Sequence, residues 1–285
     1  MRNHPSRSSA LFLGKLCVLS ALLATSGCES EAYTVSSTLD ADRNSLRAAI
    51  STVNQRPTRP ARIELPSGTY ELTRCGMDVG NRAGDLDLNT RAPVTIVATG
   101  GPVTIRQTCA GERVLEALGT GTLTLIGVTL TGGTLTNDDP DAPAEGGGVR
   151  AAADLVLEAV TITGNSATGA PGESVASGTP VPGGAAQGGG VFVAAALRMT
   201  NASIVSNTAT GGLGTDATTT DITPAPGGSA AGGGVYVVKA ITVTGGRIAQ
   251  NRAAGGVGGK SVLFPDGTPS PEAGTGGHAR GGGVA

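Results

Sequence analysis

The 285-residue sequence contains no tryptophan, three phenylalanines and three tyrosines. Large aromatic side chains supply much of the buried area of ordinary globular cores, so a core of that kind is excluded. Histidine is equally scarce, because His4 and His278 are far apart and have no cysteine partners at metal-ligand spacing. The sequence therefore predicts no bound metal and no cofactor.

Positive charge is also scarce. Without Arg2, Arg7 and Lys15, the chain carries 17 Lys and Arg against 22 Asp and Glu, a net charge of −5. Nucleic-acid-binding domains present clustered basic residues, and no such cluster occurs, so nucleic acid is excluded as a partner. The apolar run over residues 16–24 is also much shorter than the roughly 20 residues that cross a bilayer.

The amino-terminal residues predict export. Basic residues, the apolar run and the small residues TSG lead to Cys28, a pattern that resembles a bacterial lipoprotein signal. We expect a signal peptide over residues 1–27 and a lipid on Cys28, although Thr25 stands where such signals usually have leucine. The alternative is ordinary cleavage after Ser26. The predicted location is the outer membrane or cell surface as a lipoprotein, or otherwise the secreted fraction.

Four cysteines are present, and export decides how they are used. Cys17 leaves with the signal peptide and Cys28 is the lipidation candidate, so Cys75 and Cys109 remain. A disulfide between them is predicted, because such bonds form outside the cytoplasm. Two isolated buried thiols are the alternative.

Glycine is abundant, with 47 residues, and much of it belongs to an internal repeat that begins GGGV at Gly146, Gly188 and Gly232. From the third glycine of each triplet to an asparagine is always 17 residues, whereas the interval from that asparagine to the next triplet grows from 25 to 27 to 32 residues. A constant core therefore alternates with inserts of variable length, which surface loops tolerate. We expect these inserts near residues 170–187, 212–231 and 256–280.

The constant core predicts strands, because its apolar residues alternate with a period of two. Three short strands per repeat follow from this pattern, and an earlier half-copy over residues 123–133 extends the array. One repeat cannot bury its apolar face alone, but stacked repeats form a continuous core. The predicted fold is all-β, a right-handed parallel β-helix (β-solenoid) with a short amino-terminal capping helix. The aligned apolar residues are Val149, Ala151, Leu155, Leu157, Val160 and Ile162 and their equivalents in the later copies.

The repeated asparagines, Asn165, Asn207 and Asn251, predict a structural ladder. Stacked amides can bond from one repeat to the next, and asparagine also tolerates the left-handed backbone of a sharp turn. No acidic or basic residue recurs beside them, so a structural role is favoured over a catalytic one.

The segment before the repeats predicts a cap. Residues 28–36 are expected to be a linker, residues 37–72 a capping region, and the β-helix to fill residues 37–285. Residues 44–54 place Leu46, Ala49, Ile50 and Val53 on one helical stripe, with Asn44 or Ser45 as the N-cap. Strands are predicted over residues 62–65 and 69–72, separated by a Pro-Ser-Gly turn.

The order NSLRAA, IELPSGTYEL, VTIVATGGPVTI and LTLIGVTLTGG resembles exported right-handed parallel β-helix proteins of the pectin-lyase-like superfamily, above all those with a CSLREA segment. The Cys and Glu of that segment are absent here. The GGGV and I-x-x-N pairs are also similar to repeats of polymorphic outer-membrane proteins, an adhesin-like family. The resemblance covers nearly all of the chain after the signal peptide and implies an extracellular β-helix.

Enzymes of this fold need clustered carboxylates and a basic residue on adjacent coils. The outward columns of the repeats contain no such cluster. One column, Arg150, Phe192 and Tyr236, is a possible ligand stripe, although a stacking ladder is favoured. For residues 137–141 a solvated turn is favoured over a calcium loop, and for residues 211–216 a role in calcium binding is disfavoured.

The inserts predict function best. They are rich in Gly, Ala, Pro, Thr and Ser and leave the same corner of the coil, so we expect a flexible fringe. Variable loops on a rigid scaffold commonly carry binding. The expected function is a non-catalytic, adhesin-like or envelope-display role, with surface or matrix glycans or proteins as partners. The alternatives are a polysaccharide lyase or glycoside hydrolase, and a purely structural envelope component.

Overall fold

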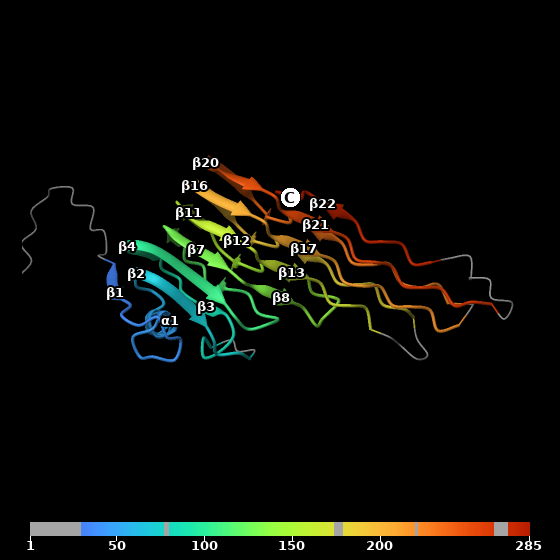
Figure 1. The fold of residues 1–285 in the computed structure, drawn as a ribbon, viewed down its shortest axis with the longest axis horizontal. Coiled ribbons are helices and arrows are strands. Elements are labelled where there is room, and N and C mark those ends of the chain that lie inside the picture. The colour runs from blue at the N-terminus through green and yellow to red at the C-terminus, as the bar shows by residue number, and fades with distance from the viewer. Residues whose placement is uncertain (1–29, 77–79, 174–178, 220–221, 265–272) are drawn as a thin grey trace, which may run out of the picture.

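The computed structural model describes residues 30–76, 80–173, 179–219, 222–264 and 273–285. Parallel strands dominate this part of the chain, which contains one helix, α1 (Leu46–Asn54) (Figure 1). The all-β prediction is therefore confirmed. The predicted signal peptide and Cys28 lie outside the described residues. No helix in the described part has the length and apolar composition needed to cross a bilayer.

Four sheets run side by side along the molecule, and every strand pairing within them is parallel. The first sheet contains β1 (Glu31–Thr34), β2 (Ala61–Leu72), β4 (Val94–Gln107), β6 (Leu123–Ile126), β7 (Val128–Thr131), β11 (Leu155–Glu158), β12 (Thr161–Thr163), β16 (Ala196–Val205) and β20 (Ala240–Ala249). The second contains β3 (Leu86–Leu88), β5 (Leu115–Ala117), β10 (Val149–Ala151), β15 (Val191–Val193) and β19 (Val235–Val237). The third contains β8 (Thr134–Thr136), β13 (Ser166–Thr168), β17 (Thr208–Thr210) and β21 (Arg252–Ala254). The fourth contains β9 (Ala144–Glu145), β14 (Ala186–Gln187), β18 (Ala230–Ala231) and β22 (Ala279–Arg280).

Each repeat forms one layer, and equivalent residues of successive repeats are in register. Leu155 is opposite Leu197, which is opposite Ile241. The alternating apolar positions point inward, and those of the first two repeats are almost fully buried. Burial of these columns is the main source of stability, at about 25 cal/mol per Å² of apolar surface. We call this set of layers the stack.

The strands are more numerous than the sequence predicts. The first repeat contains five, β10 to β14, rather than three, because the residues that flank the insert also pair with neighbouring layers. Residues 61–72 form the single strand β2 rather than two strands. The register shifts between Pro66 and Gly68, so the predicted turn is an irregularity within a continuous strand. In addition, β1 lies inside the expected linker and pairs with β2.

The corners of the layers differ from the prediction in one detail. The left-handed backbone lies one residue before each ladder asparagine, at Gly164 (φ 64), Ser206 (φ 55) and Gln250 (φ 57). Asn165, Asn207 and Asn251 themselves are not left-handed. Asparagine is therefore needed at these positions for the hydrogen bonds of its side-chain amide, and not for its ability to adopt the left-handed backbone conformation.

The helix α1 is the predicted cap. Ser45 is its N-cap, and the Ser45 hydroxyl accepts a hydrogen bond from the Ala48 N–H at 3.2 Å. The helix buries Leu46, Ile50 and Val53 against β2 and β3. The predicted apolar stripe is therefore the buried face, and it covers the open end of the core near its amino-terminal side.

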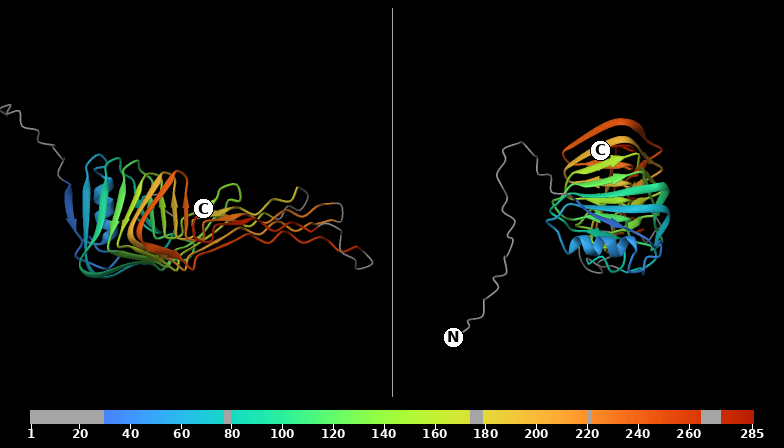
Figure 2. Two further views of the ribbon diagram at one scale, coloured as in Figure 1. Left: turned by 90° about the horizontal axis from the view of Figure 1, so that it is seen from above. Right: turned by 90° about the vertical axis from the view of Figure 1, so that its left-hand side faces the viewer.

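The inserts are not a flexible fringe of independent loops. Their described parts run outward from the stack as extended legs that lie side by side (Figure 2). Outgoing and returning legs alternate in a hydrogen-bonded series, so we call these legs the insert array. The series joins Gly184 N–H to Ala170 O at 2.7 Å, Gly212 to Gly184 at 2.9 Å, Gly228 to Gly212 at 2.8 Å, Gly256 to Gly228 at 2.8 Å, and Gly277 to Gly256 at 2.8 Å.

Glycine is required where these legs meet. A Cβ on Gly212 would lie 1.8 Å from the Ala170 carbonyl oxygen, and one on Gly256 would lie 1.8 Å from the Gly212 oxygen. Backbones can approach this closely only without side chains, as at the axis of collagen. The glycine-rich composition that suggested flexibility therefore serves close packing.

Candidate functional site

One column of side chains on the outer face of the second sheet brings together most of the ionisable and aromatic residues of interest. Register pairs Asp87 with Glu116, Glu116 with Arg150, Arg150 with Phe192, and Phe192 with Tyr236. The predicted stripe Arg150, Phe192 and Tyr236 is therefore the later part of a longer column. Two carboxylates occupy its amino-terminal end.

These carboxylates belong to a cluster that the sequence analysis did not expect. Ligand oxygens of Asp85, Asp87 and Glu116 lie within 4.8 Å of one another. The expectation that no carboxylates cluster is therefore wrong. That expectation was based on the regular repeats alone. Asp85 and Asp87 come from the irregular region before the repeats, where no periodicity shows whether a side chain points into the core or outward.

Burial controls the protonation of Asp85. The residue is 8% exposed, and desolvation raises the pKa of its carboxyl to about 7. Arg113 opposes this shift, but its Nε lies 3.6 Å from the Asp85 carboxylate, beyond hydrogen-bonding distance. The negative charges of Asp87 and Glu116 raise the pKa of Asp85 further. The cluster therefore contains one carboxyl group, that of Asp85, which exchanges its proton near neutral pH and lies beside the carboxyl groups of Asp87 and Glu116.

Arginines hold the remaining charges. Arg113 bonds to Glu116 through Nη1, and Arg150 contacts Glu116 at 3.3 Å and Glu145 at 2.6 Å. Because Glu116 already has two cationic partners, much of its charge is neutralised. Asp87 accepts a hydrogen bond from the Asn81 N–H at 3.1 Å.

The backbone that carries Asp85 is positioned by Arg47 of the NSLRAA segment. Arg47 is 3% exposed and donates to the carbonyl oxygens of Ala83 at 3.2 Å, Gly84 at 2.9 Å and Asp85 at 2.7 Å. Its charge is paired with Asp40 at 2.7 Å. The motif that carried the family resemblance therefore fixes the end of the segment between β2 and β3, which we call the acidic loop, against α1.

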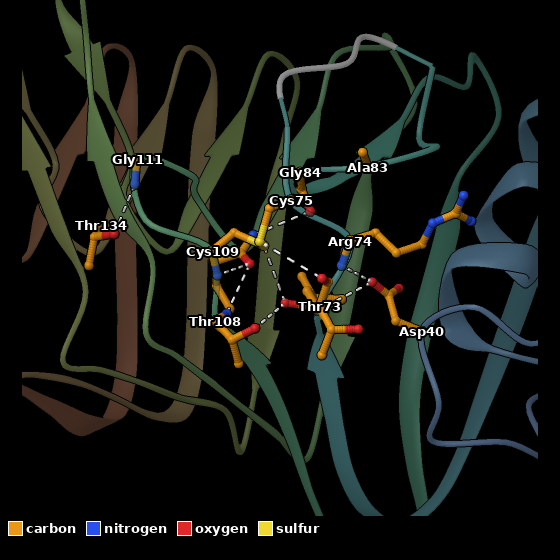
Figure 3. The surroundings of a disulfide bond; sticks show 12 residues. Asp40, Thr73, Arg74, Cys75, Ala83, Gly84, Thr108, Cys109, Gly111 and Thr134 are labelled. Carbon is orange, nitrogen blue, oxygen red and sulfur yellow. Dashed lines mark hydrogen bonds between the residues drawn. A yellow bond between two sulfur atoms is a disulfide. The ribbon is translucent and has the colours of Figure 1, made fainter.

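A disulfide fixes the same loop from the other side. Cys75 and Cys109 are bonded, with Cα atoms 5.2 Å apart, so the predicted pairing is confirmed. Figure 3 shows the bond where the chain after β2 passes the end of β4. Asp40 also accepts from the N–H groups of Thr73 at 2.9 Å and Arg74 at 3.1 Å. The acidic loop is therefore anchored at both ends.

The cluster opens into a pocket of about 480 Å³. The acidic turn over residues 137–141 forms part of its wall. That turn is closed by its own hydrogen bonds, such as Asp141 N–H to Asp139 Oδ1 at 2.9 Å, as expected for a surface turn. The pocket is lined by Asp85, Asp87, Gly111, Glu112, Arg113, Glu116, Leu135, Thr136, Asn137, Asp138 and Asp139. With six carboxylates and one arginine, it favours neutral or cationic molecules over polyanions.

The aromatic end of the column is a stack. The rings of Phe192 and Tyr236 lie 5.7 Å apart with an interplanar angle of 5°, and the Arg150 guanidinium lies 5.9 Å from the Phe192 ring. Phe192 is only 5% exposed. Its ring faces are therefore occupied by neighbouring side chains, and the column resembles the stacking ladder more than an open ligand stripe.

The three ladder asparagines lie in consecutive layers. Asn207 Oδ1 accepts from the backbone N–H of Asn165 at 3.0 Å and from its Nδ2 at 3.1 Å, and Asn251 does the same for Asn207 at 2.9 and 3.0 Å. In the half-copy, Gly133 donates its N–H to Asn165 at 2.9 Å. These amides satisfy buried backbone groups and face no pocket residue named above.

The glycine-rich residues 211–216 have a packing role. Gly211, Gly212 and Gly214 contact the backbone of neighbouring legs, and Asp216 Oδ1 accepts from the Lys260 N–H at 2.7 Å. That carboxylate therefore links two inserts of the array.

The acidic cluster has two chemical capacities. Carboxylate oxygens are the ligands that Ca²⁺ prefers, so Asp85, Asp87 and Glu116 are the residues that could hold such an ion, in competition with Arg113 and Arg150. A carboxyl with a pKa near 7 beside other carboxyl groups can also act as a general acid.

A scan of protein-family models matched no family, and searches of curated proteins and of solved structures found no similar chain.

Proposed function

We propose that this chain is an exported, lipid-anchored protein without catalytic activity, which displays the insert array at the cell surface in an adhesin-like or envelope role. The array carries this proposal. Its legs extend beyond the stack, and Leu213 and Val257 are 56% and 68% exposed on adjacent outgoing legs. An extended surface of this kind suits contact with a surface glycan or protein better than enclosure of a small substrate.

The fold that we propose for the stack is a right-handed parallel β-helix. Equivalent asparagines are 42 and 44 residues apart, as expected for one turn per repeat. Connections between parallel strands of one sheet are right-handed in nearly all proteins, which supports that hand. With the NSLRAA segment and the GGGV repeats, this supports membership of the pectin-lyase-like superfamily.

Export and anchoring are supported separately. The Cys75–Cys109 disulfide is typical of proteins outside the cytoplasm. The basic, apolar and small residues before Cys28 support a lipoprotein signal. We therefore place the protein at the outer membrane or cell surface.

A binding experiment tests the display role. Purified protein is applied to a glycan array, to matrix proteins and to whole cells, and the Gly212→Ala variant is compared with the wild type. A Cβ at Gly212 would force two legs apart, so binding through the array should fall at least tenfold. The control is Gly276→Ala, because the new Cβ would lie an ordinary contact distance of 3.7 Å from its nearest neighbour, the Gly256 oxygen. Failure of the wild type to bind any of these would favour a purely structural envelope component.

The acidic pocket favours one alternative, a carbohydrate-active enzyme. Asp85 would act as general acid, with Asp87 as the second carboxyl group of the pair. Six lining carboxylates disfavour a polyuronate substrate, so a hydrolase acting on neutral or amino sugars is the more suitable form of this alternative.

Turnover decides between the two functions. The protein is incubated with acidic, neutral and amino polysaccharides, and new reducing ends and unsaturated uronates are measured. We expect neither product. Turnover that is lost in Asp85→Asn, while the variant remains folded, would overturn the non-catalytic proposal.

A further inference from the structure

The first layer of the stack forms an end face. Glu31 is opposite Ala61 and Thr34 is opposite Glu64, and further along the same layer Leu39 is opposite Glu71. Among the described residues, no strand pairs with the other edge of β1. Residues 31–39 therefore lie outside β2 at one end of the molecule.

The proposed lipidation site is close to this face in the sequence. Cys28 precedes Glu31, the first residue of β1, by three residues. A lipid on Cys28 would hold this end of the stack at the bilayer surface.

We propose that the end face formed by residues 31–39 and the turn after α1 is a membrane-contacting surface for anionic phospholipid headgroups, and that it orients the molecule with the insert array away from the bilayer. The inference rests on the proposed acylation of Cys28.

An exposed apolar side chain lies on this face. Leu39 is 66% exposed, and among the described residues up to 212 it is the only exposed large hydrophobic residue. The other exposed large hydrophobic residues, from Leu213 onward, lie in the array and the last layers. An isolated leucine beside a lipid anchor can enter the interface between headgroups and acyl chains, where apolar area strengthens binding.

The same end carries an excess of positive charge. Arg56 and Arg59 have side chains that are 54% and 65% exposed, and both bond to one carboxylate, Glu31, at 2.7 and 2.8 Å. Arg91 is exposed and lies next to this turn, because its N–H bonds to the Pro57 oxygen at 2.6 Å. Among the described residues of β1 and this turn, three arginines are thus counted against one carboxylate, Glu31. The other charges around the face occur in equal numbers. Arg62 is paired with Glu64 and Arg106 with Glu71, and Arg43 follows Asp42 in the sequence.

This local excess is notable because the chain as a whole has a net charge of −2. Anionic lipid surfaces attract exposed Lys and Arg and repel acidic surfaces. The end face is therefore better suited to an anionic bilayer than the acidic pocket is.

The direction of the array agrees with this orientation. In both Figure 1 and Figure 2, the legs extend away from β1, toward the opposite side of the molecule. When the β1 end rests on the bilayer, the inserts point into the surroundings of the cell.

The first measurement separates this inference from the proposed anchoring. The full-length chain is expressed with its leader, and the mass of its amino-terminal peptide is determined. We expect an acylated Cys28, and no acylation in Cys28→Ser. An unmodified Cys28 in the exported wild type would overturn the anchoring and the inference together.

The second measurement tests the face itself. Leu39→Cys is labelled with an environment-sensitive fluorophore in the acylated protein and reconstituted on phosphatidylglycerol vesicles. The control is Leu213→Cys, whose parent residue is 56% exposed in the array. Lipid-borne quenchers should quench the label at position 39 at least fivefold more strongly. Equal quenching in an acylated protein would overturn the inference and leave the anchoring intact.

The third measurement removes positive charges from the end face and follows vesicle binding, so it needs no fluorescent label. In a Cys28→Ser background, Arg56→Gln/Arg59→Gln should lower partitioning onto phosphatidylglycerol vesicles about tenfold, since each basic residue near an anionic surface contributes several-fold. Arg198→Gln/Arg247→Gln removes two exposed arginines from the body of the stack and should leave partitioning unchanged. Equal partitioning of the two double variants would contradict the proposed headgroup contact.

Discussion

The stack and the insert array are both built from extended segments side by side, but they are held together by different groups. The stack buries columns of Leu, Ile and Val, whereas the described array pairs backbone with backbone and places glycine where the legs meet. A cluster of five alanines, Ala144, Ala167, Ala186, Ala209 and Ala230, lies between the two regions. Side-chain size thus decreases outward from the stack, and in the array close packing of backbones takes the place of a hydrophobic core.

Four experiments test how far the two regions differ in stability. The largest effect is expected in the stack, from Cys75→Ser/Cys109→Ser. The bond closes a loop with a sequence separation of 34, which corresponds to about 4 kcal/mol of unfolding free energy in the chain-entropy model. Urea unfolding should show this loss, and reductant should destabilise the wild type but not the variant. The hydrogen-exchange rates of the array amides should not change. Faster exchange there would contradict the expectation that the array opens independently of the stack.

The next effect concerns the asparagine ladder. Asn207→Ala removes the acceptor of two Asn165 donors and the Nδ2 group that donates to the Ile162 and Val205 oxygens, in a buried site. We expect a loss of about 2 to 3 kcal/mol in thermal or urea unfolding. Asn251→Ala is the matched control, because Asn251 is only half-buried and water can replace its bonds. An equal loss of unfolding free energy in both variants would contradict the expectation that burial makes the bonds of Asn207 more stabilising than those of Asn251.

A third, pH-dependent effect also belongs to the stack alone. The Asp85 carboxyl has a folded-state pKa of about 7 against an ordinary value of 3.8, so the folded protein retains a proton that the unfolded chain releases between these values. Wild-type stability should therefore fall as pH rises from about 4 to 7, because the unfolded state binds fewer protons.

Asp85→Asn should remove that pH dependence. The difference in unfolding free energy between the variant and the wild type should therefore be about 1 to 2 kcal/mol more favourable to the variant at pH 8 than at pH 4. This is less than the roughly 4 kcal/mol of the full pKa difference, since water can reach the carboxylate from the open pocket. Urea unfolding at the two pH values measures it. The same pH dependence in the variant would show that another group is responsible.

The smallest global effect is expected in the array. Gly212→Ala places a Cβ 1.8 Å from the Ala170 oxygen, so the legs must separate locally while the melting temperature stays within about 2 °C. Hydrogen exchange of the Gly228 and Gly256 amides should accelerate at least tenfold. Gly276→Ala should leave both quantities unchanged. A large fall in melting temperature for Gly212→Ala would show that the array and the stack unfold as one unit.

The repeat region could be predicted well because its spacing repeats. The 17-residue interval aligned the inward columns, the ladder asparagines and the Arg150, Phe192 and Tyr236 column, and the structure places these residues in register. The acidic cluster could not be predicted in this way, because Asp85 and Asp87 occur once and outside the repeat. The sequence feature that points to these residues is the acidic segment GDLDL, residues 84–88, together with Arg113. Neither is repeated elsewhere in the chain, so no alignment of repeats could bring them together.

The sequence was enough to predict the all-β class, the parallel stacking of equivalent residues, the position of the cap and the pairing of Cys75 with Cys109. Each of these depends on local alternation, repetition or the count of residues of one kind. The ordered array of the inserts and the meeting of Asp85 with Asp87 and Glu116 emerge only in the folded chain. Both depend on distances between segments that no local pattern encodes, since hydrogen bonds between glycine backbones and the desolvation of a carboxyl arise only when the chain is folded.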